Sequence, residues 1–496
     1  MFGTTSAAGS PLRDNAKKFA IGSVLVVLFS AIAVATALLN ELHEDFESFT
    51  APAKTIKGLA PILADVEPGE PQTILLLGSD RRLSDIKAKL KPRSDTIIVA
   101  HLDPDKHTTA IMSLPRDLMV DITGHGRGKL NDAFRIGGAK LMYLTVSDLL
   151  SIDIHHVVNV NFNGFQRAVN RLGCVYVDVD RRYFNDNTGP EPNYAVIDLK
   201  PGYQKLCGSD SLDYVRYRHQ DSDFVRAARQ QEFLRQAKAQ IGLERLFRDR
   251  RELLTIFGNY TETDIADDND AEILGLLKLG YQASKEPLTE VRFPATDCPD
   301  RTCVEIAADE LIDTVDRFID VRGADTDEDE EESKPKPIKP SKGLAPGLIF
   351  AQQEGENLVL SMDLRLSPLG LPVYFPRARL GKGGYTRDGS PRSYEIFDRN
   401  RKRHRAYRIV LSAGEVGEYY GVQGTTWKDA PILDDFDDEV RMRGRTYQRY
   451  FDGRRIRMIA WKRPEGAYWV SNTLSQRLTN RQMMDIARSL QRIAGS

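Results

Sequence analysis

Short apolar runs rich in β-branched residues, separated by turn residues, dominate the chain from residue 73 onward. They predict strands at 73–78, 96–102, 108–114 and 118–122. A helical period then alternates with further strands, which gives a helix at 137–152, a strand at 155–162, a helix at 165–173 and a strand at 174–180. Because strands alternate with helices, we expect an α/β fold whose sheet is covered by helices on both faces.

The rest of this first domain is predicted to be mainly helical. The helical pattern runs from residue 208 to about residue 285, and a closing strand at 286–296 and a short helix at 307–319 complete the domain near residue 320. An acidic block followed by alternating lysine and proline then occupies 324–347. Because this segment has too little apolar surface to bury, we interpret it as an extended linker.

A second strand pattern follows the linker. It predicts strands at 371–376, 406–411, 445–451, 455–461 and 466–474, and an amphipathic helix at 480–493. Residues 348–496 are therefore expected to form a smaller α+β domain, to which the sequence assigns no chemistry.

An uncharged stretch near the start of the chain, residues 19–39, is long enough to cross a bilayer as one helix. A buried core helix rarely stays apolar for this length, and the apolar region of a cleavable signal peptide is usually shorter. Basic residues precede the stretch and acidic residues follow it. The positive-inside rule then predicts a cytoplasmic tail at 1–18, a single retained span, and an extracytoplasmic chain from about residue 42 onward.

Composition adds two constraints. The chain has 69 basic and 71 acidic residues and a formal net charge of −2, so no overall field favours nucleic acid. The four cysteines fit an exported chain, in which an even number suggests disulfides. The proposed pairs are Cys174–Cys207 and Cys298–Cys303, although four cysteines allow three connectivities and unpaired buried thiols are the alternative.

Charged residues gather at the predicted ends of strands in the first domain. Four segments supply them: Asp80, Arg81 and Arg82 after one strand, Arg93 and Asp95 before the next, Arg116 and Asp117 between two strands, and Lys129 and Asn131 after a glycine-rich loop. Loops at strand ends of an α/β sheet are where ligands usually bind. Any one of these charges alone is more often a surface ion pair, so only the whole set indicates a site.

The stretch DYVRYRHQDSDFVRAARQQEF at 213–233 adds a cluster of four arginines, Arg216, Arg218, Arg226 and Arg229. Arginine presents a planar fork suited to bidentate phosphate binding. Asp80 and Asp95 offer carboxylates to a hard cation such as Mg²⁺, which typically bridges phosphates. A diphosphate held by arginines and a divalent ion is the simplest ligand that satisfies both sets.

Other motifs do not fit. The loop GHGRGKL lacks the spacing of a phosphate-binding loop, and neither a dinucleotide fingerprint nor a serine nucleophile elbow is present. The basic run RNRKRHRAYR at 399–408 would pass for a nucleic-acid patch. In an extracytoplasmic domain, we expect it to be a solvated strand edge or a contact for an anionic wall polymer.

Taken in order, these segments resemble the LytR-CpsA-Psr family of bacterial envelope proteins over roughly residues 70–240. The resemblance rests on the N-terminal span and on LLLGSDRR, RSDTIIVAHLDP, SLPRDLMVDI, GKLNDAF and YVRYRHQDSDFVRAARQQEFL, of which the last is the most specific. It implies a catalytic domain at 70–320 that forms a three-layer α/β/α sandwich around a mixed central sheet, with an apolar tunnel for a polyprenyl chain.

The resemblance also implies roles for individual residues. Asp80 and Asp95 resemble the pair that holds Mg²⁺ or Mn²⁺. The implied catalytic residues are Arg93, Asp95, Arg116, Arg218 and Arg226. The implied substrate-binding residues are Arg81, Arg82, Lys129, Asn131, Arg229 and Gln230. The general base stays open between Asp95, Asp117 and Asp221.

Members of this family transfer glycopolymers from polyprenyl-pyrophosphate carriers to peptidoglycan. The resemblance therefore implies a Mg²⁺-dependent phosphotransferase of cell-wall biogenesis, which forms a phosphodiester bond and is anchored in the bacterial cell membrane. Its expected partners are the lipid-linked glycan and the peptidoglycan acceptor, with no nucleic acid. Two alternatives stay open: a polyprenyl-pyrophosphate hydrolase, and a non-enzymatic membrane-anchored regulator or attenuator of transcription.

Overall fold

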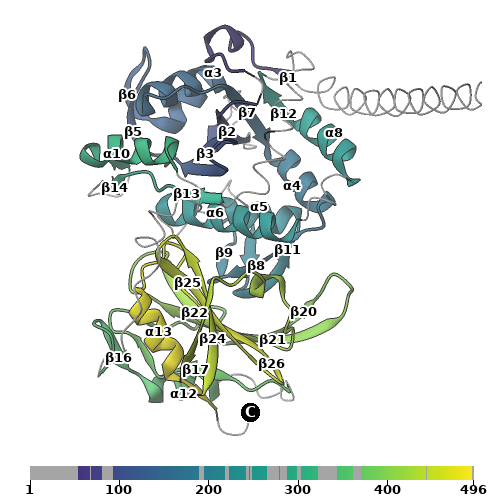
Figure 1. The fold of residues 1–496 in the computed structure, drawn as a ribbon, viewed down its shortest axis with the longest axis vertical. Helices are drawn as coiled ribbons and strands as arrows, with labels where there is room; N and C mark the ends of the chain where they lie inside the picture. The colour runs from purple at the N-terminus through teal and green to yellow at the C-terminus, as the bar shows by residue number, and fades with distance from the viewer. Residues whose placement is uncertain are drawn as a thin grey trace, which may run out of the picture.

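The computed structural model describes residues 54–67, 69–80, 93–188, 195–217, 223–241, 245, 248–264, 279, 288–298, 303–321, 343–360, 370–442 and 444–493 (Figure 1). The predicted cytoplasmic tail, the predicted span at 19–39 and most of the predicted linker lie outside these residues. Within the described part of the chain, no helix has both the length and the apolar character needed to span a bilayer.

A seven-stranded mixed sheet forms the centre of the first domain. Its strands, in spatial order, are β1 (Lys54–Thr55), β12 (Thr261–Thr263), β7 (His156–Asn161), β2 (Gln72–Asp80), β3 (Arg93–Asp103), β4 (Thr108–Ser113) and β13 (Leu288–Glu290). Strand β2 is antiparallel to β3 and parallel to β7, and β4 is antiparallel to β3 and parallel to β13. The α/β fold with a mixed central sheet is therefore confirmed.

Helices cover both faces of this sheet because successive side chains of each strand point to opposite sides. On one face, Leu75 and Val99 pack into the main core with α3 (Leu130–Leu150) and α10 (Ala308–Ile319). On the other face, α4 (Phe162–Arg171) packs on Val160, where a Cβ on Gly164 would lie 3.3 Å from the valine Cγ1. Helix α6 (Asp223–Gln240) is hydrogen-bonded to this second face through Thr96.

Two segments of the first domain differ from the prediction. Residues 174–180 form β8 (Val175–Val179), which pairs with β11 (Gly202–Leu206) outside the main sheet. Every residue of β8 is buried, so its pattern does not reveal which sheet it joins. The strand predicted at 286–296 divides into β13 and β14 (Ala295–Asp297) around Pro294, which has no N–H to donate to a ladder.

Helix α3 is longer than the sequence suggested, because it begins at Leu130 and not at residue 137. It bends at Gly138, whose φ of 69° lies in the left-handed region that glycine adopts without steric cost. The bend lies where the predicted helix begins, so the turns before it, residues 130–136, were not recognised as helix.

Folded structure also extends slightly beyond the predicted domain limits. Strand β1 pairs with β12, and Leu59 is fully buried in the main core, so the first domain includes residues before the predicted limit at residue 70. Ala345 packs in the core of the second domain, before its predicted start at residue 348.

The second domain is built on an eight-stranded antiparallel sheet. Its strands, in spatial order, are β19 (Gly384–Tyr385), β21 (Arg403–Ser412), β22 (Tyr419–Thr425), β26 (Gly466–Ser471), β25 (Arg455–Arg463), β24 (Arg445–Asp452) and β23 (Asp438–Met442), with β20 (Arg392–Phe397) also paired to β21. Helix α13 (Asn480–Ser489) starts at a capping box made by Thr479 and Gln482. The prediction of helix up to residue 493 is wrong, because Leu490–Arg492 form β27 against β17 (Tyr374–Pro376).

The basic run at 399–408 is a solvated strand edge only in part, because residues 399–403 are exposed but the run continues into the sheet. It enters β21, which pairs with β20 on one side and with β22 on the other. Arg408, the last residue of the run, is 0% exposed. The prediction failed because a buried arginine with a partner on another domain looks the same in the sequence as an exposed one.

The two domains share a buried aromatic core where the β8–β11 ribbon meets the second sheet (Figure 1). Tyr176 of β8 meets the Trp427 ring edge-on at a centroid distance of 5.1 Å, and Tyr203 of β11 meets the Trp469 ring at 5.6 Å. Edge-to-face aromatic pairs of this kind are stabilising beyond the area that they bury.

A buried ion pair lies beside these rings. Arg408 Nη1 donates to Asp178 Oδ2 at 3.0 Å, and Trp469 Nε1 donates to the same oxygen at 3.0 Å. Arg408 Nη2 donates to Ser471 Oγ at 2.9 Å. Since Asp178 belongs to the first domain and the other three residues to the second, this network joins the two domains through a desolvated contact.

Both proposed disulfides are present. Cys174 is bonded to Cys207 and Cys298 to Cys303, and the described part of the chain has no free cysteine. The first bond joins the residue before β8 to the residue before α5 (Gly208–Arg216). It therefore fixes the ribbon that carries the domain contact to the helix that leads into the arginine-rich stretch.

Stability should depend on pH through Glu290, which faces the second domain. Burial, followed by the Asp452 carboxylate, raises the pKa of Glu290 from 4.5 to about 7, against the opposing effect of Arg235. The folded state then binds more protons than the unfolded state between these two values, so the free energy of unfolding falls as pH rises through this range. We expect Glu290→Gln to remove this contribution, at most about 3 kcal/mol, in denaturation experiments below and above pH 7. An unchanged pH dependence in the variant would contradict the assignment.

Candidate functional site

The antiparallel pairing of β2 and β3 brings three predicted site residues to one end of the sheet. Asp80 lies opposite Arg93, and Ser79 lies opposite Ser94. The register then shifts, because the next pair is Gly78 with Thr96, so Asp95 is the extra residue of a β-bulge. Bulges redirect a side chain out of the regular alternation and are frequent beside active sites. The backbone thus places Asp80, Arg93 and Asp95 together, although the structure does not describe their side chains.

Arg116 reaches the same end of the sheet through β4. Strand β4 ends at Ser113, opposite Ile98 of β3, and Leu114 N donates to Ile97 O at 2.9 Å. Pro115 then begins a tight turn closed by Leu118 N and Pro115 O at 3.2 Å. Arg116 is the second residue of this turn, so it lies at the end of the sheet.

Lys129 and Asn131 converge on the neighbouring Asp117. Strand β5 (Met119–Ile122) and strand β6 (Gly126–Lys129) form the hairpin that returns the chain to this point. Asp117 Oδ1 accepts from Asn131 Nδ2 at 3.2 Å and lies 3.6 Å from Lys129 Nζ, while its Oδ2 lies 3.4 Å from Arg116 Nη2. One carboxylate thus fixes three predicted site residues, which identifies Asp117 as a positioning residue for the cationic groups.

Helix α6 supplies the opposite wall. Arg226 lies in its first turns and is only 6% exposed. One turn later, Gln230 Nε2 donates to Thr96 Oγ1 at 3.1 Å and to Val215 O at 3.2 Å. Since Thr96 directly follows Asp95, Gln230 fixes the helix that carries Arg226 against the strand that carries Arg93 and Asp95. Gln230 therefore positions the two walls relative to each other.

Arg229 lies behind the site and not on a solvent-facing wall. Its side chain is 0% exposed, and its guanidinium lies 4.6 Å from the centroid of Tyr183, 5.8 Å from that of Tyr214 and 5.7 Å from that of Tyr217. Its Nη2 also donates to Tyr217 O. This arrangement anchors α6 to the end of α5 by cation–π contacts, which are strongest when desolvated.

Arg216, another member of the cluster, is bound within its own helix. Its Nε and Nη2 donate to Asp213 Oδ1 at 3.2 Å and 3.0 Å. Burial raises the pKa of Asp213, and the Arg216 charge counteracts this effect. The pair therefore stabilises the last turn of α5.

Sequence reasoning missed the residues that support the site. Ser79 Oγ donates to Asn159 Oδ1 at 2.7 Å, which joins the end of β2 to β7. The sequence did not identify Thr96 as a supporting residue of the site, because β-branched residues are common in strands. Tyr214 lies close to the arginines in the sequence, but its contact with Arg229 depends on tertiary packing and could not be predicted from that position. Arg81, Arg82, Arg218 and Asp221 lie outside the described residues.

The second face of the sheet carries an apolar cluster next to the site. Ile98, Ala100 and Ile111 form it, with Leu76 and Leu102 at its border. A small cavity of about 20 Å³ lies nearby between Pro115, Phe224 and Phe293. This volume holds about one water and no isoprenoid chain, so the cavity itself is not the implied tunnel.

Two sets of residues in the chain have side chains of the types that bind metal ions. Among described side chains, the one grouping with suitable spacing is Cys298, Cys303 and Glu305, but both thiols are oxidised in a disulfide and offer no thiolate. The Asp80 and Asp95 pair fits a hard cation by its oxygen donors and by its place on adjoining strands.

The chain is similar to a known family and to several named proteins. The profile of the LytR_cpsA_psr family matches residues 35–315, more than half of the chain. The polyisoprenyl-teichoic acid–peptidoglycan teichoic acid transferase TagU of Enterococcus faecalis is 30% identical over 262 residues, which cover 52% of this chain and 82% of that protein. The corresponding transferase TagT of Bacillus subtilis is 34% identical over 173 residues, which cover 35% of this chain and 53% of that protein.

Solved structures match about half of the chain. Bacillus subtilis TagV is 26% identical with a TM-score of 0.41, and the match covers 51% of this chain and 99% of that one. The Bacillus subtilis protein YwtF (TagT) with bound octaprenyl pyrophosphate lipid is 23% identical with a TM-score of 0.38, over 54% of this chain and 97% of that one. From the extent of the profile match and the similarity to TagU over most of its length, the chain belongs to the LytR_cpsA_psr family.

Proposed function

We propose that this protein is a phosphotransferase that moves a glycopolymer from a polyprenyl-pyrophosphate carrier onto peptidoglycan in cell-wall biogenesis. The similarity to TagU and TagT, whose names state transfer of teichoic acid to peptidoglycan, supports this reaction class. The observation that carries the proposal is the convergence of Asp80, Arg93, Asp95 and Arg116 at one sheet end, with Arg226 on the helix fixed there.

The proposed reaction forms one P–O bond and breaks another. A hydroxyl of the acceptor sugar attacks the phosphorus next to the glycan, and the bond from that phosphorus to the bridging oxygen breaks. Polyprenyl phosphate leaves, the hydroxyl proton passes to a base, and a phosphodiester results. Arg116 and Arg226 stabilise the charge that develops on the bridging and non-bridging oxygens, because phosphoryl transfer depends mainly on positioning and electrostatics.

A divalent cation fits the remaining part of this site. Asp80 and Asp95 would hold Mg²⁺ or Mn²⁺, which, when bound, neutralises phosphate charge. Asp117 is engaged by Arg116, Lys129 and Asn131, so we give it a positioning role and leave the proton acceptor open between Asp95 and Asp221.

The lipid and the membrane complete the proposal. The apolar cluster of Ile98, Ala100 and Ile111 begins two residues after Thr96, so a polyprenyl chain on this face would leave its pyrophosphate at the arginines. We place residues 1–18 in the cytoplasm, residues 19–39 in the membrane and the chain from about residue 42 onward on its outer side. The two disulfides support an oxidising, extracytoplasmic compartment.

Transfer can be distinguished from hydrolysis and from a purely regulatory role in one assay. The full-length chain in detergent is mixed with a lipid-pyrophosphate-linked glycan, peptidoglycan and Mg²⁺. We expect glycan bound covalently to peptidoglycan, loss of this product in EDTA, and its recovery when Mg²⁺ is added back. Free glycan phosphate as the only product would indicate a hydrolase, and no turnover would favour the regulator. Full transfer in EDTA would refute the metal while leaving the transferase intact.

A further inference from the structure

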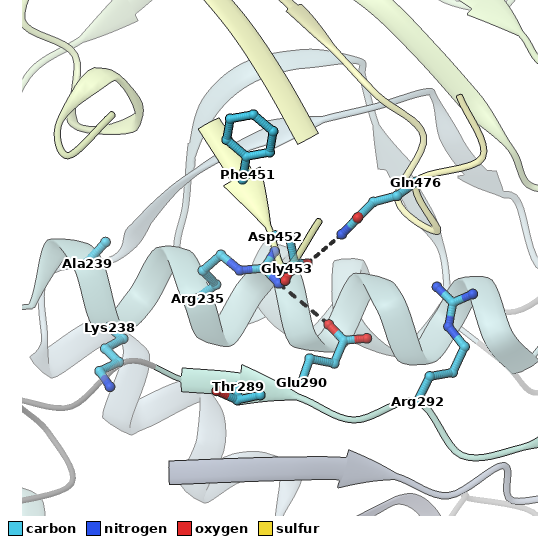
Figure 2. Close-up of a pocket in the computed structure, with 10 residues that line it drawn as sticks. All are labelled: Arg235, Lys238, Ala239, Thr289, Glu290, Arg292, Phe451, Asp452, Gly453 and Gln476. Carbon is cyan, nitrogen blue, oxygen red and sulfur yellow. Dashed lines mark hydrogen bonds and ion pairs between the residues drawn. The ribbon is translucent and has the colours of Figure 1, made fainter. Parts of the chain in front are cut away.

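A cavity of about 620 Å³ lies between the two domains, close to the arginine site but separate from it (Figure 2). Helix α6 and strand β13 of the first domain form one side, and the turn after β24 and the loop at Gln476 of the second domain form the other. The volume is in the range of small-molecule sites, about 300–1,000 Å³. No role proposed above uses this cavity.

The charged groups of the cavity are arranged around Arg235. Its Nη2 lies 2.7 Å from Asp452 Oδ2 and 3.5 Å from Glu290 Oε2, and its Nη1 lies 2.6 Å from Glu232 Oε2. The amide of Gln476 donates to the same Asp452 oxygen. Arg235 thus pairs with carboxylates of both domains and joins the two walls.

Two further cations line the cavity on either side of this central cluster. Figure 2 shows Lys238 on one side of Arg235 and Arg292 on the other. Arg292 Nη2 also donates to Ser475 O at 3.3 Å, which holds its fork at the rim. The lining contains three cations and two carboxylates, and Glu232, which pairs with Arg235 beside the lining, balances their charge, so protonation of Glu290 leaves a positive surplus.

The uncharged lining residues suit a sugar. Phe451 offers an aromatic surface, and Thr289 and Gln476 offer a hydroxyl and an amide. The C–H groups of a pyranose face pack on an aromatic ring, whose face is electron-rich. An anionic group on that sugar would be attracted by the two rim cations.

The cavity is linked to the Arg116 side of the arginine site. Arg226 and Arg235 are nine positions apart on α6, about 14 Å along the helix axis and half a turn around it, so their side chains leave opposite sides of the helix. The small cavity at Pro115, next to Arg116, shares Glu290 and Arg292 with this larger one. A short oligosaccharide with its reacting end at the arginines would therefore place a later sugar between the domains.

We propose that this interdomain cavity binds an anionic sugar of one of the two glycan substrates, with Lys238 and Arg292 on its carboxylate or phosphate and Phe451 against the sugar ring. The inference rests on the transferase function proposed above and gives the second domain a part in glycan recognition. The anionic sugar has two sources: a muramic acid of peptidoglycan that carries no stem peptide and so has a free carboxylate, and the phosphate of the transferred polymer.

Protonation of Glu290 should strengthen this binding. Its raised pKa of about 7 reflects burial and the Asp452 carboxylate, with Arg235 and Arg292 acting in the opposite direction and Glu232 in the same one. Because protonation removes one negative charge from the lining, we expect anionic sugars to bind more tightly below pH 7 than above it.

The test is saturation binding to the full-length chain in detergent, with three probes. The probes are the N-acetylglucosamine–N-acetylmuramic acid disaccharide, oligo(glycerol phosphate), and the neutral N,N′-diacetylchitobiose. We expect at least one anionic probe to bind about tenfold more tightly than the neutral one, since a charge-assisted contact typically contributes that much. Preference for the muramic disaccharide would assign the acceptor to the cavity, and preference for the phosphate oligomer would assign the donor.

Variants then locate the binding. The double variant Lys238→Ala/Arg292→Ala should weaken binding of the preferred probe about tenfold. Ala239→Trp, at an exposed rim position, should block it by filling the mouth. The control Lys462→Ala/Arg463→Ala removes the same two charge types from the far end of β25 and should leave binding unchanged. Binding should also persist in Arg226→Ala.

The proposal is overturned if neither anionic probe binds the wild-type chain, if both cavity variants bind as wild type does, or if a sugar-free stem peptide competes fully. Failure of the proposed function gives a different result, since the probes would then bind the cavity while the lipid-linked glycan is not transferred.

Discussion

Replacing Arg226 with alanine is expected to lower the rate of glycan transfer by about a hundredfold or more, the loss typical of removing one preorganised charge from a transition state. Arg226 is almost completely buried, and Gln230 fixes its helix to the strand of Arg93 and Asp95. Its charge therefore acts in a desolvated position and needs no reorganisation during the reaction. Initial rates of transfer to peptidoglycan provide the measurement.

Two further variants serve as controls for this result. Arg226→Lys keeps the charge but loses the planar fork, so we expect an intermediate rate. Arg167→Ala removes an arginine whose contact is the Tyr260 ring on the neighbouring helix α8 (Arg250–Tyr260), and it should keep the wild-type rate. If Arg226→Ala retained full activity with an unchanged circular dichroism spectrum, the site would have to be placed elsewhere.

Replacing Asp178 with alanine should cost about 3–5 kcal/mol of stability, because it leaves the buried Arg408 guanidinium without its counter-charge. The same carboxylate oxygen also accepts from Trp469 Nε1, so that indole loses its acceptor in the variant. The midpoint of urea denaturation, followed by tryptophan fluorescence, reports this change directly, since two of the three tryptophans line the domain contact.

A matched control lies on the same strand as Arg408. Arg403 is 58% exposed and pairs with the exposed Glu395 at 3.2 Å. Arg403→Ala should therefore cost less than about 1 kcal/mol. Equal losses in Asp178→Ala and Arg403→Ala would mean that the domain contact does not contribute to the stability of the folded chain.

The parts predicted correctly from the sequence are those that depend on local order. Short apolar runs rich in β-branched residues located β2, β3 and β4, and the charges that follow Gly78 and Pro115 indicated the end of the sheet where the site lies. The cysteine pairs were also identified from their number and spacing.

The parts that failed depend on contacts between distant segments. The pattern of β8 is that of any buried strand, and its partner β11 begins more than twenty residues later, after β9 (Tyr183–Asn185) and β10 (Ile197–Leu199). Arg229 and Arg226 have similar neighbours in the sequence, but Arg229 contacts the rings of Tyr183 and Tyr217, which belong to other parts of the fold. Arg408 was misjudged for the same reason, since the counter-charge lies 230 positions away.

The aromatic contact between the domains changes how the linker at 324–347 should be understood. Its composition separates two stretches of sequence, but Tyr203 and Trp469 on either side of it belong to one continuous core. The two halves thus relate to each other as the subunits of an obligate dimer do, although they belong to one chain. A fragment that ends at residue 320 would keep the arginines and carry an exposed aromatic face made for a missing partner.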